Sequence, residues 1–162
     1  MSFMSAALDR LDIRILDVLQ HDASLNSKEI GERVGLSSSP CYRRIKRMCD
    51  VGIITKRVTY LSRKALGFDF EAFVEIKLKE PSNANIIKFE RVVLCLPEVL
   101  LCRGVSGDVD FILHIVTLNL DRFDSFLRMN ILCLDVVSDV SSSVVVRSAK
   151  EGIALPLKYI PV

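Results

Sequence analysis

The chain has 162 residues, of which 50% are hydrophobic and 26% are charged, a balance that predicts a packed core in one or two domains. No apolar run reaches the roughly 18–20 residues that a membrane span requires, and the first residues lack the basic and apolar segments of a signal peptide. We therefore expect a cytoplasmic protein. The five cysteines include no C-x-x-C pair, so we expect buried free thiols and neither a metal site nor a cofactor.

Basic residues concentrate in the first part of the chain. Residues 1–64 contain 12 Lys and Arg against 7 Asp and Glu, whereas residues 65–162 contain 10 against 13. Six basic side chains and a single acid fall between positions 43 and 57. A basic segment on a nearly neutral protein favours a polyanionic partner for this part of the chain.

Three short helices are expected before residue 52. In residues 8–20, apolar residues recur every three or four positions and form one stripe, and the aspartates fall mostly off it. Ser27 is the expected N-cap of a second helix. Gly35 ends this helix, because glycine tolerates the left-handed conformation. A third helix is expected from the N-cap Ser37 to about Val51.

A basic β element is expected after the third helix. The string IITKRVTYL, residues 53–61, alternates and is rich in β-branched residues, which is typical of a strand. Three helices followed by such an element predict a winged helix-turn-helix domain. We assign it to residues 1–61, with the turn-helix core at about 27–48, and assign residues 62–68 to a linker.

The remaining part, residues 69–162, is expected to form an α+β domain. Its elements follow the order β-α-β-β-α-β, which predicts a ferredoxin-like sandwich with two helices on one face of the sheet. A second copy of the chain is the simplest cover for the other face, so we expect a homodimer. The expected elements are, in chain order, 70–78, 83–96, 99–105, 111–116, 120–132 and 136–146.

The third expected helix has one core face and one polar face. On a helical wheel, Cys41, Tyr42, Ile45, Met48 and Cys49 cluster on the core side. The other side has small residues at its start and basic residues behind them. Small residues allow close approach to base edges in the major groove.

Arginine in this helix offers a rigid fork that fits guanine or spans phosphate oxygens. The basic residues of the wing suit phosphate contacts, which position a protein without reading sequence. An ordinary surface helix with a solvated basic face is the alternative. The predicted DNA-binding residues are Ser27, Ser38, Ser39, Pro40, Arg43, Arg44, Arg47, Lys56 and Arg57.

Several segments together resemble one known family. The order and spacing of LDRLDIRIL (8–16), IGERVGLS (30–37), SPCYRRIKRM (39–48), SGDVDF (106–111) and ALPL (154–157) are similar to those of the leucine-responsive and asparagine-operon (Lrp/AsnC, feast/famine) regulators. The resemblance implies a helix-turn-helix joined to a ligand-binding, oligomerisation domain of the RAM or ACT-like type. It also implies nucleoid-associated dimers that assemble into tetramers or octamers, and a small effector, often an amino acid, bound between dimers.

A free amino acid needs an acceptor for its ammonium group and donors for its carboxylate. The turn at 106–110 offers the Asp110 carboxylate and backbone N–H groups near Gly107. The resemblance adds contacts from the last strand. The predicted effector-binding residues are Arg103, Gly107, Asp108, Asp110, Ser142, Ser143 and Val144.

The chain departs from the family pattern at three places, one of which is Arg103, where many members have an apolar or small polar residue. Val109 stands where an aromatic residue is usual, and Asp135-Val136 stands where Pro-Gly is usual. A purely structural role for the turn therefore stays open.

Two other functions are considered. One is an effector-independent architectural protein that wraps DNA. The other is a tetrapyrrole decarboxylase-like enzyme, known among relatives of this layout, which would need basic and histidine residues around a large pocket. The second half has only one histidine, His114, in an apolar strand. No Ser-His-Asp set, P-loop or G-x-G-x-x-G is present, so we predict no catalytic residues and no enzyme.

Overall fold

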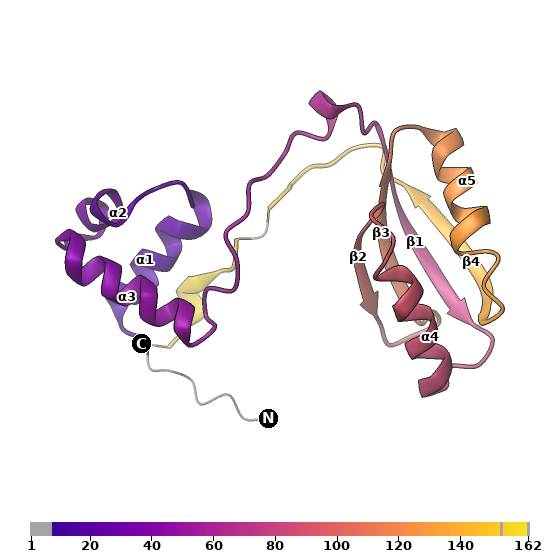
Figure 1. Cartoon of the computed structure of the whole chain (residues 1–162), viewed down its shortest axis with the longest axis horizontal. Coiled ribbons are helices and arrows are strands. Elements are labelled where there is room, and N and C mark those ends of the chain that lie inside the picture. The colour runs from indigo at the N-terminus through magenta and orange to yellow at the C-terminus, as the bar shows by residue number, and fades with distance from the viewer. Residues whose placement is uncertain (1–7, 153, 162) are drawn as a thin grey trace. The chain divides into compact units, whose positions relative to one another are not determined.

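The structure, a computed structural model, describes residues 8–152 and 154–161 and divides into two compact units (Figure 1). The first unit holds the described residues up to Tyr60 and those from Lys150 onward, and the second is Leu61–Ala149. The tail after residue 149 therefore differs from the predicted boundary, which assigned it to the second domain. The tail is held by Gln20, whose side-chain amide accepts from the N–H of Leu155 at 2.9 Å and donates to its carbonyl at 3.1 Å.

The first helix, α1 (Arg10–His21), begins with a reciprocal cap. The Asp9 carboxylate accepts from the N–H of Asp12 at 2.9 Å, and the Asp12 carboxylate accepts from the N–H of Asp9 at 3.1 Å. Ile15 and Leu19 are buried, as the apolar stripe predicted. Asp12 has no exposed surface. The prediction that it lies off the stripe is wrong, because its spacing of three and seven residues from Ile15 and Leu19 places it on the same face.

The second helix, α2 (Ser27–Val34), is capped one residue earlier than predicted. Asn26 has an extended backbone, and its side chain accepts from the N–H groups of Lys28 and Glu29. Ser27 is instead the first residue of the helix. Gly35 ends the helix with a φ of 79°, in the left-handed region that the sequence predicted.

The third helix, α3 (Ser38–Asp50), follows α2 after a tight turn. The N–H of Leu36 donates to the carbonyl of Gly31 at 2.8 Å. A Cβ added to Gly31 would lie 2.5 Å from the carbonyl oxygen of Leu36, so only glycine allows this approach. The three helices share one buried cluster, formed by Ile15, Leu19, Ile30, Val34, Cys41, Ile45 and Met48.

The predicted wing strand is not formed in the described part of the chain. After a bend at 53–54, residues 55–61 run as an extended trace without strand pairing (Figure 1). A strand needs a partner for its backbone groups, and in the described part of the chain the side chains of Val58, Tyr60 and Leu61 are exposed. The expectation of buried thiols is also wrong in part. Cys41 is buried and Cys102 half-buried, whereas Cys49, Cys95 and Cys133 are exposed.

The second unit has the predicted β-α-β-β-α-β order, preceded by a short 3-10 turn, η1, in the linker. Its sheet is antiparallel with strand order β2-β3-β1-β4. No helix in the described part of the chain is both long and apolar enough to cross a bilayer. The remaining elements are η1 (Lys64–Leu66), β1 (Phe70–Leu78), α4 (Asn83–Val93), β2 (Val99–Gly104), β3 (Phe111–Thr117), α5 (Leu120–Asn130), β4 (Val137–Val144) and, in the tail, η2 (Leu157–Tyr159).

Helices α4 and α5 pack on one face of this sheet (Figure 1). Phe89 of α4 lies 4.7 Å from Phe111 of β3 between ring centroids, and both belong to one buried cluster with Phe123 of α5. The opposite face, which we call the open face, carries half-exposed and exposed side chains in the described part of the second unit. There the half-exposed ring of Phe73 stacks on His114, with centroids 4.8 Å apart.

Candidate nucleic-acid interface

The exposed face of α3 carries polar and basic side chains. Ser38 and Ser39 are exposed at its start, and its N-cap, Ser37, makes no side-chain hydrogen bond to the first turn. Free N–H groups at a helix N-terminus favour an anion. Arg43 and Lys46 are exposed further along α3, and none of the ion pairs among the described residues involves either of them. Both cations are therefore available to a partner.

A hollow of about 440 Å³ with a mixed polar and apolar lining lies beside this face. Ser27, at the start of α2, lines it together with Lys46 of α3 and Arg57 of the extended segment. Tyr42 and Cys49 also line it, and both are exposed although they were predicted to be core residues. Lys46 was not among the predicted DNA-binding residues. The hollow brings the cations of Lys46 and Arg57 beside the hydroxyl-bearing residue Ser27, an arrangement that suits a phosphate group.

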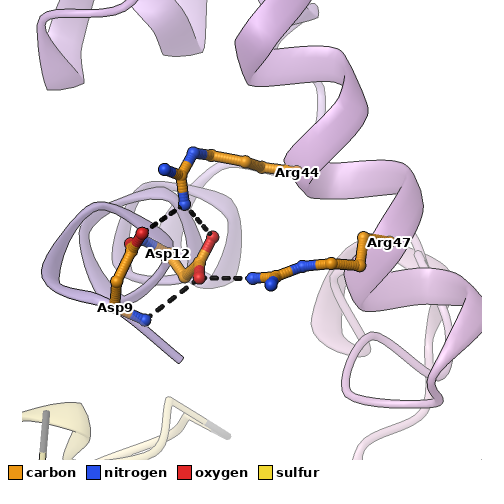
Figure 2. Close-up of polar contacts among 4 residues, drawn as sticks. All are labelled: Asp9, Asp12, Arg44 and Arg47. Carbon is orange, nitrogen blue, oxygen red and sulfur yellow. Dashed lines mark hydrogen bonds and ion pairs between the residues drawn. The ribbon is translucent and has the colours of Figure 1, made fainter. Parts of the chain in front are cut away.

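Arg44 and Arg47, two of the predicted DNA-binding residues, point from α3 toward α1, as Figure 2 shows. Arg44 Nη1 donates to Asp12 Oδ1 at 2.9 Å and to Asp9 Oδ2 at 2.6 Å. Arg47 Nη2 donates to Asp12 Oδ2. The two acids and two arginines therefore form one ion cluster across the α1–α3 contact, which we call the Asp12 cluster.

Hydrogen bonding within the Asp12 cluster favours the charged forms of Asp9 and Arg44. The hydrogen bond from the backbone of Asp12 is the largest cause that lowers the pKa of Asp9, and Arg44 lowers it further. The hydrogen bonds to Asp12 and then to Asp9 raise the pKa of Arg44. Asp12 is the member that sequence reasoning missed, although its helical spacing carried the signal.

Lys56 and Arg57 lie in the extended segment after α3 and are exposed. Both line an apolar cavity of about 520 Å³ whose other walls include Leu16 and Leu19 of α1 and Leu155 of the tail. Of these two residues, Arg57 also lines the hollow beside α3. The structure thus brings Arg57 to the α2–α3 surface, whereas Lys56 lines only the apolar cavity.

The turn between β2 and β3 ties itself to the end of β1 through Asp110. Its Oδ2 accepts from the N–H of Leu78 at 2.7 Å, and its own N–H donates to the carbonyl of Ile76 at 2.9 Å. Gly107 has a φ of 140°, which favours glycine, and it is exposed together with Asp108. One oxygen of the Asp110 carboxylate is therefore already used to hold the turn.

The other predicted effector residues are not brought to this turn within one chain. Asp110 lies beside Leu78, whereas Ser143 of β4 pairs with Phe73, five residues back along β1. At a rise of roughly 3.4 Å per residue, the two levels are about 17 Å apart along the sheet. Ser142 and Val144 point to the helix-covered face and Ser143 to the open face. Arg103 lies on the edge strand β2, exposed.

His114, the histidine of the second half that an enzyme would require, is paired with Glu71 on the sheet. Its Nε2 lies 2.5 Å from Glu71 Oε1, and Arg63 donates to the other oxygen of the same carboxylate. Among the described residues, no three His, Cys, Asp or Glu side chains gather as a metal site.

The fold and the surface of α3 define a helix-turn-helix DNA-binding protein with a second α+β unit. Comparison with known families agrees. Residues 8–48 match the AsnC-type helix-turn-helix domain, and residues 71–155 match the Lrp/AsnC ligand binding domain. The chain belongs to the Lrp/AsnC family of DNA-binding transcriptional regulators, as its sequence resemblance predicted.

Individual relatives match along nearly their whole length. The chain is 32% identical over 151 residues to the DNA-binding transcriptional activator DecR of Escherichia coli K12, covering 93% of this chain and 99% of that protein. It is 35% identical over 145 residues to the leucine-responsive regulatory protein of Rhizobium meliloti, covering 90% and 93%. The structure of the transcriptional regulator NMB0573 from Neisseria meningitidis, solved as an L-Met complex, has a TM-score of 0.91 and 33% identity, covering 94% and 99%.

Proposed function

We propose that this regulator binds double-stranded DNA as a homodimer at the cytoplasmic nucleoid, with α3 of each copy in the major groove. The observation that carries this proposal is the exposed face of α3, where small residues at the start precede Arg43 and Lys46. The hollow formed by Ser27, Lys46 and Arg57 supplies the neighbouring phosphate contact. Contacts to phosphates fix the position of the protein, whereas Arg43 reads a base edge.

A second copy of the chain is proposed to cover the open face of the sheet. That face carries the half-exposed ring of Phe73 beside His114 and Ile112. The segment at 53–61, whose sequence is typical of a strand, also has no strand partner in the part of the chain that the structure describes. A symmetric dimer pairs each of these surfaces with itself. Assembly of such dimers into tetramers or octamers is part of the proposal.

Arg43→Ala is expected to lower affinity for the specific site about 10- to 100-fold, because one good bidentate base contact contributes about 1–3 kcal/mol of discrimination. Lys46→Ala is expected to weaken specific and scrambled DNA alike and to reduce the salt slope by about one. Arg91→Ala, which removes the same charge from an exposed site on α4, serves as control. Fluorescence polarisation at fixed salt measures all three. Wild-type discrimination in the Arg43 variant would contradict the assignment.

We further propose that a free amino acid, bound between subunits, modulates DNA binding. Support comes from the L-Met complex of a structural relative at 33% identity and from the Asp110 carboxylate, whose Oδ1 is left for an ammonium group. A single amino acid cannot span the roughly 17 Å between Asp110 and Ser143. If both contact the effector, two chains must supply them.

Asp110→Asn separates the two roles of this side chain. Asparagine keeps an oxygen that can accept from the N–H of Leu78, so the turn should stay folded, but the charge that holds an ammonium group is lost. A charge-assisted hydrogen bond contributes about 1.5–3 kcal/mol, so effector affinity should fall roughly 10- to 100-fold while DNA binding without effector is unchanged. Titration with the twenty amino acids in the presence of labelled DNA measures both. An unchanged effector response would refute the assignment of Asp110.

The same titration tests the whole proposal against the architectural alternative. The probe is the DNA upstream of the protein's own gene, compared with a scrambled sequence at constant salt, because the phosphate contribution depends steeply on salt. A preference for the upstream DNA that shifts with one amino acid supports a sensing regulator. Equal affinity for both DNAs, with no response to any amino acid, would favour a DNA-wrapping protein.

A further inference from the structure

Asp12 is a charged side chain with no exposed surface in the helix-turn-helix unit. A buried carboxylate is costly unless charges and hydrogen bonds compensate it. Among the described residues, its side chain accepts hydrogen bonds from three groups: the N–H of Asp9, Arg44 and Arg47. Both cations come from α3, the helix that faces DNA in the proposed function. The buried charge is therefore compensated from the DNA-reading helix.

The two arginines are held in different ways. Arg44 donates to both Asp9 and Asp12 through one nitrogen, and only 28% of its side chain is exposed. Arg47 donates to Asp12 alone among the described residues, and 47% of its side chain is exposed. A guanidinium group has five N–H donors. Arg47 is thus held through one nitrogen, while the other N–H donors of its planar guanidinium group remain available to a partner.

We propose that Asp12 is a positioning residue for DNA recognition, which holds the guanidinium group of Arg47 so that its free N–H donors meet the DNA in a fixed orientation. This inference rests on the proposed function, in which α3 contacts DNA. A fork that is oriented before binding loses less conformational freedom on contact, and it discriminates between correct and incorrect geometries. Asp12 itself touches no DNA.

The expected signature is a loss of specificity with retained general affinity. In Asp12→Asn, the amide still accepts hydrogen bonds, but the ionic hold on Arg47 is lost. A freed arginine still meets phosphates, which any sequence supplies. Affinity for the specific site should fall about 10-fold, whereas affinity for scrambled DNA should stay the same or rise. A merely structural role would lower both affinities by the same factor, because less folded protein would be present.

Asp17→Asn is the matched control, since it removes the same charge from an exposed position of α1. The Asp17 carboxylate accepts from Gln20 and lies within ion-pair distance of His21, and neither residue belongs to the Asp12 cluster. Arg47→Lys provides a second test if the Asp12 variant folds poorly. Lysine keeps the charge and can pair with Asp12, but it lacks the fork. It should therefore lose specificity to a similar extent.

The decisive measurement is fluorescence polarisation with specific and scrambled DNA for wild type, Asp12→Asn, Arg47→Ala and the double variant. Asp12→Asn should have no further effect on specificity once Arg47 is alanine. Three results would overturn the inference. The first is an equal loss of affinity for specific and scrambled DNA in Asp12→Asn. The second is an unchanged ratio of specific to scrambled affinity in both Asp12→Asn and Arg47→Lys, and the third is a full additional loss of specificity in the double variant. A wild-type protein without preference would instead overturn the proposed function, and this inference with it.

Discussion

Gly31→Ala is expected to destabilise the helix-turn-helix unit by about 2 kcal/mol, in the usual range for overpacking. The added Cβ would lie 2.5 Å from the carbonyl oxygen of Leu36. That oxygen belongs to backbone, and the N–H of the same residue is bonded back to Gly31, so the turn cannot simply move away. The gain of about 1 kcal/mol in helix propensity on replacing glycine by alanine is too small to offset the clash and its consequences for packing.

Thermal unfolding and DNA titration would measure this effect together. Glu32→Ala, at the neighbouring exposed position of α2, should change stability by less than about 0.5 kcal/mol. The Gly31 variant should lose DNA binding at temperatures where the second unit is still folded. A melting temperature at or above that of the wild type would show that the turn can rearrange, and the account of Gly31 would be wrong.

Phe89→Ala is expected to cost about 3–5 kcal/mol in the second unit, the range found when a buried aromatic ring is deleted. Phe89 has no exposed surface and contacts the ring of Phe111, so α4 would lose its main contact with the sheet. Ile87→Ala, on the half-exposed side of the same helix, should cost far less. Denaturant unfolding followed by far-ultraviolet circular dichroism measures both.

The Phe89 variant also tests the assembly that is proposed for the second unit. If the open sheet face joins two copies, unfolding this unit should release monomers, and DNA affinity should fall because two half-sites are no longer read together. Sedimentation at several protein concentrations would follow the change. Loss of the second unit without dissociation and without any loss of DNA affinity would contradict dimerisation through the open sheet face.

The helices and strands could be predicted because their periodicities are strong. The alternation in 70–78 and the stripe in α1 each reflect one buried face, and the structure has elements within a few residues of the predicted bounds. The left-handed glycine at the end of α2 was equally clear. These features depend on local sequence alone, which is why a single chain reveals them.

The ion cluster at Asp12 was within reach of the sequence but was overlooked. An acid three residues before Ile15 and seven before Leu19 lies on the core face of the helix. A buried acid requires neighbouring cations, and the third helix is the part of this unit in which basic residues concentrate. Because the aspartates of this helix were predicted to face solvent, no ion pair was predicted for Asp12. The partner of each arginine, by contrast, depends on how α1 crosses α3, and composition does not reveal that geometry.

The effector site could not be predicted from the sequence because strand register is a non-local property. Asp110 and Ser143 were grouped by chemistry, yet the pairing of β1 with β3 and β4 puts them near opposite ends of the sheet. The predicted wing failed for a related reason. Residues 53–61 have the composition of a strand, but none of the strands among residues 8–152 and 154–161 pairs with them.

The reciprocal hydrogen bonds between Gln20 and Leu155 hold the tail against the first unit. The second unit is therefore inserted between two parts of the chain that both belong to the first. The polypeptide leaves the helix-turn-helix unit after Tyr60 and re-enters it at Lys150, so two covalent tethers join the units. A single proteolytic nick in either tether would leave the halves attached through the other. Excising residues 1–61 as a DNA-binding fragment would instead strip away the tail and leave the apolar walls at Leu16 and Leu19 exposed to water.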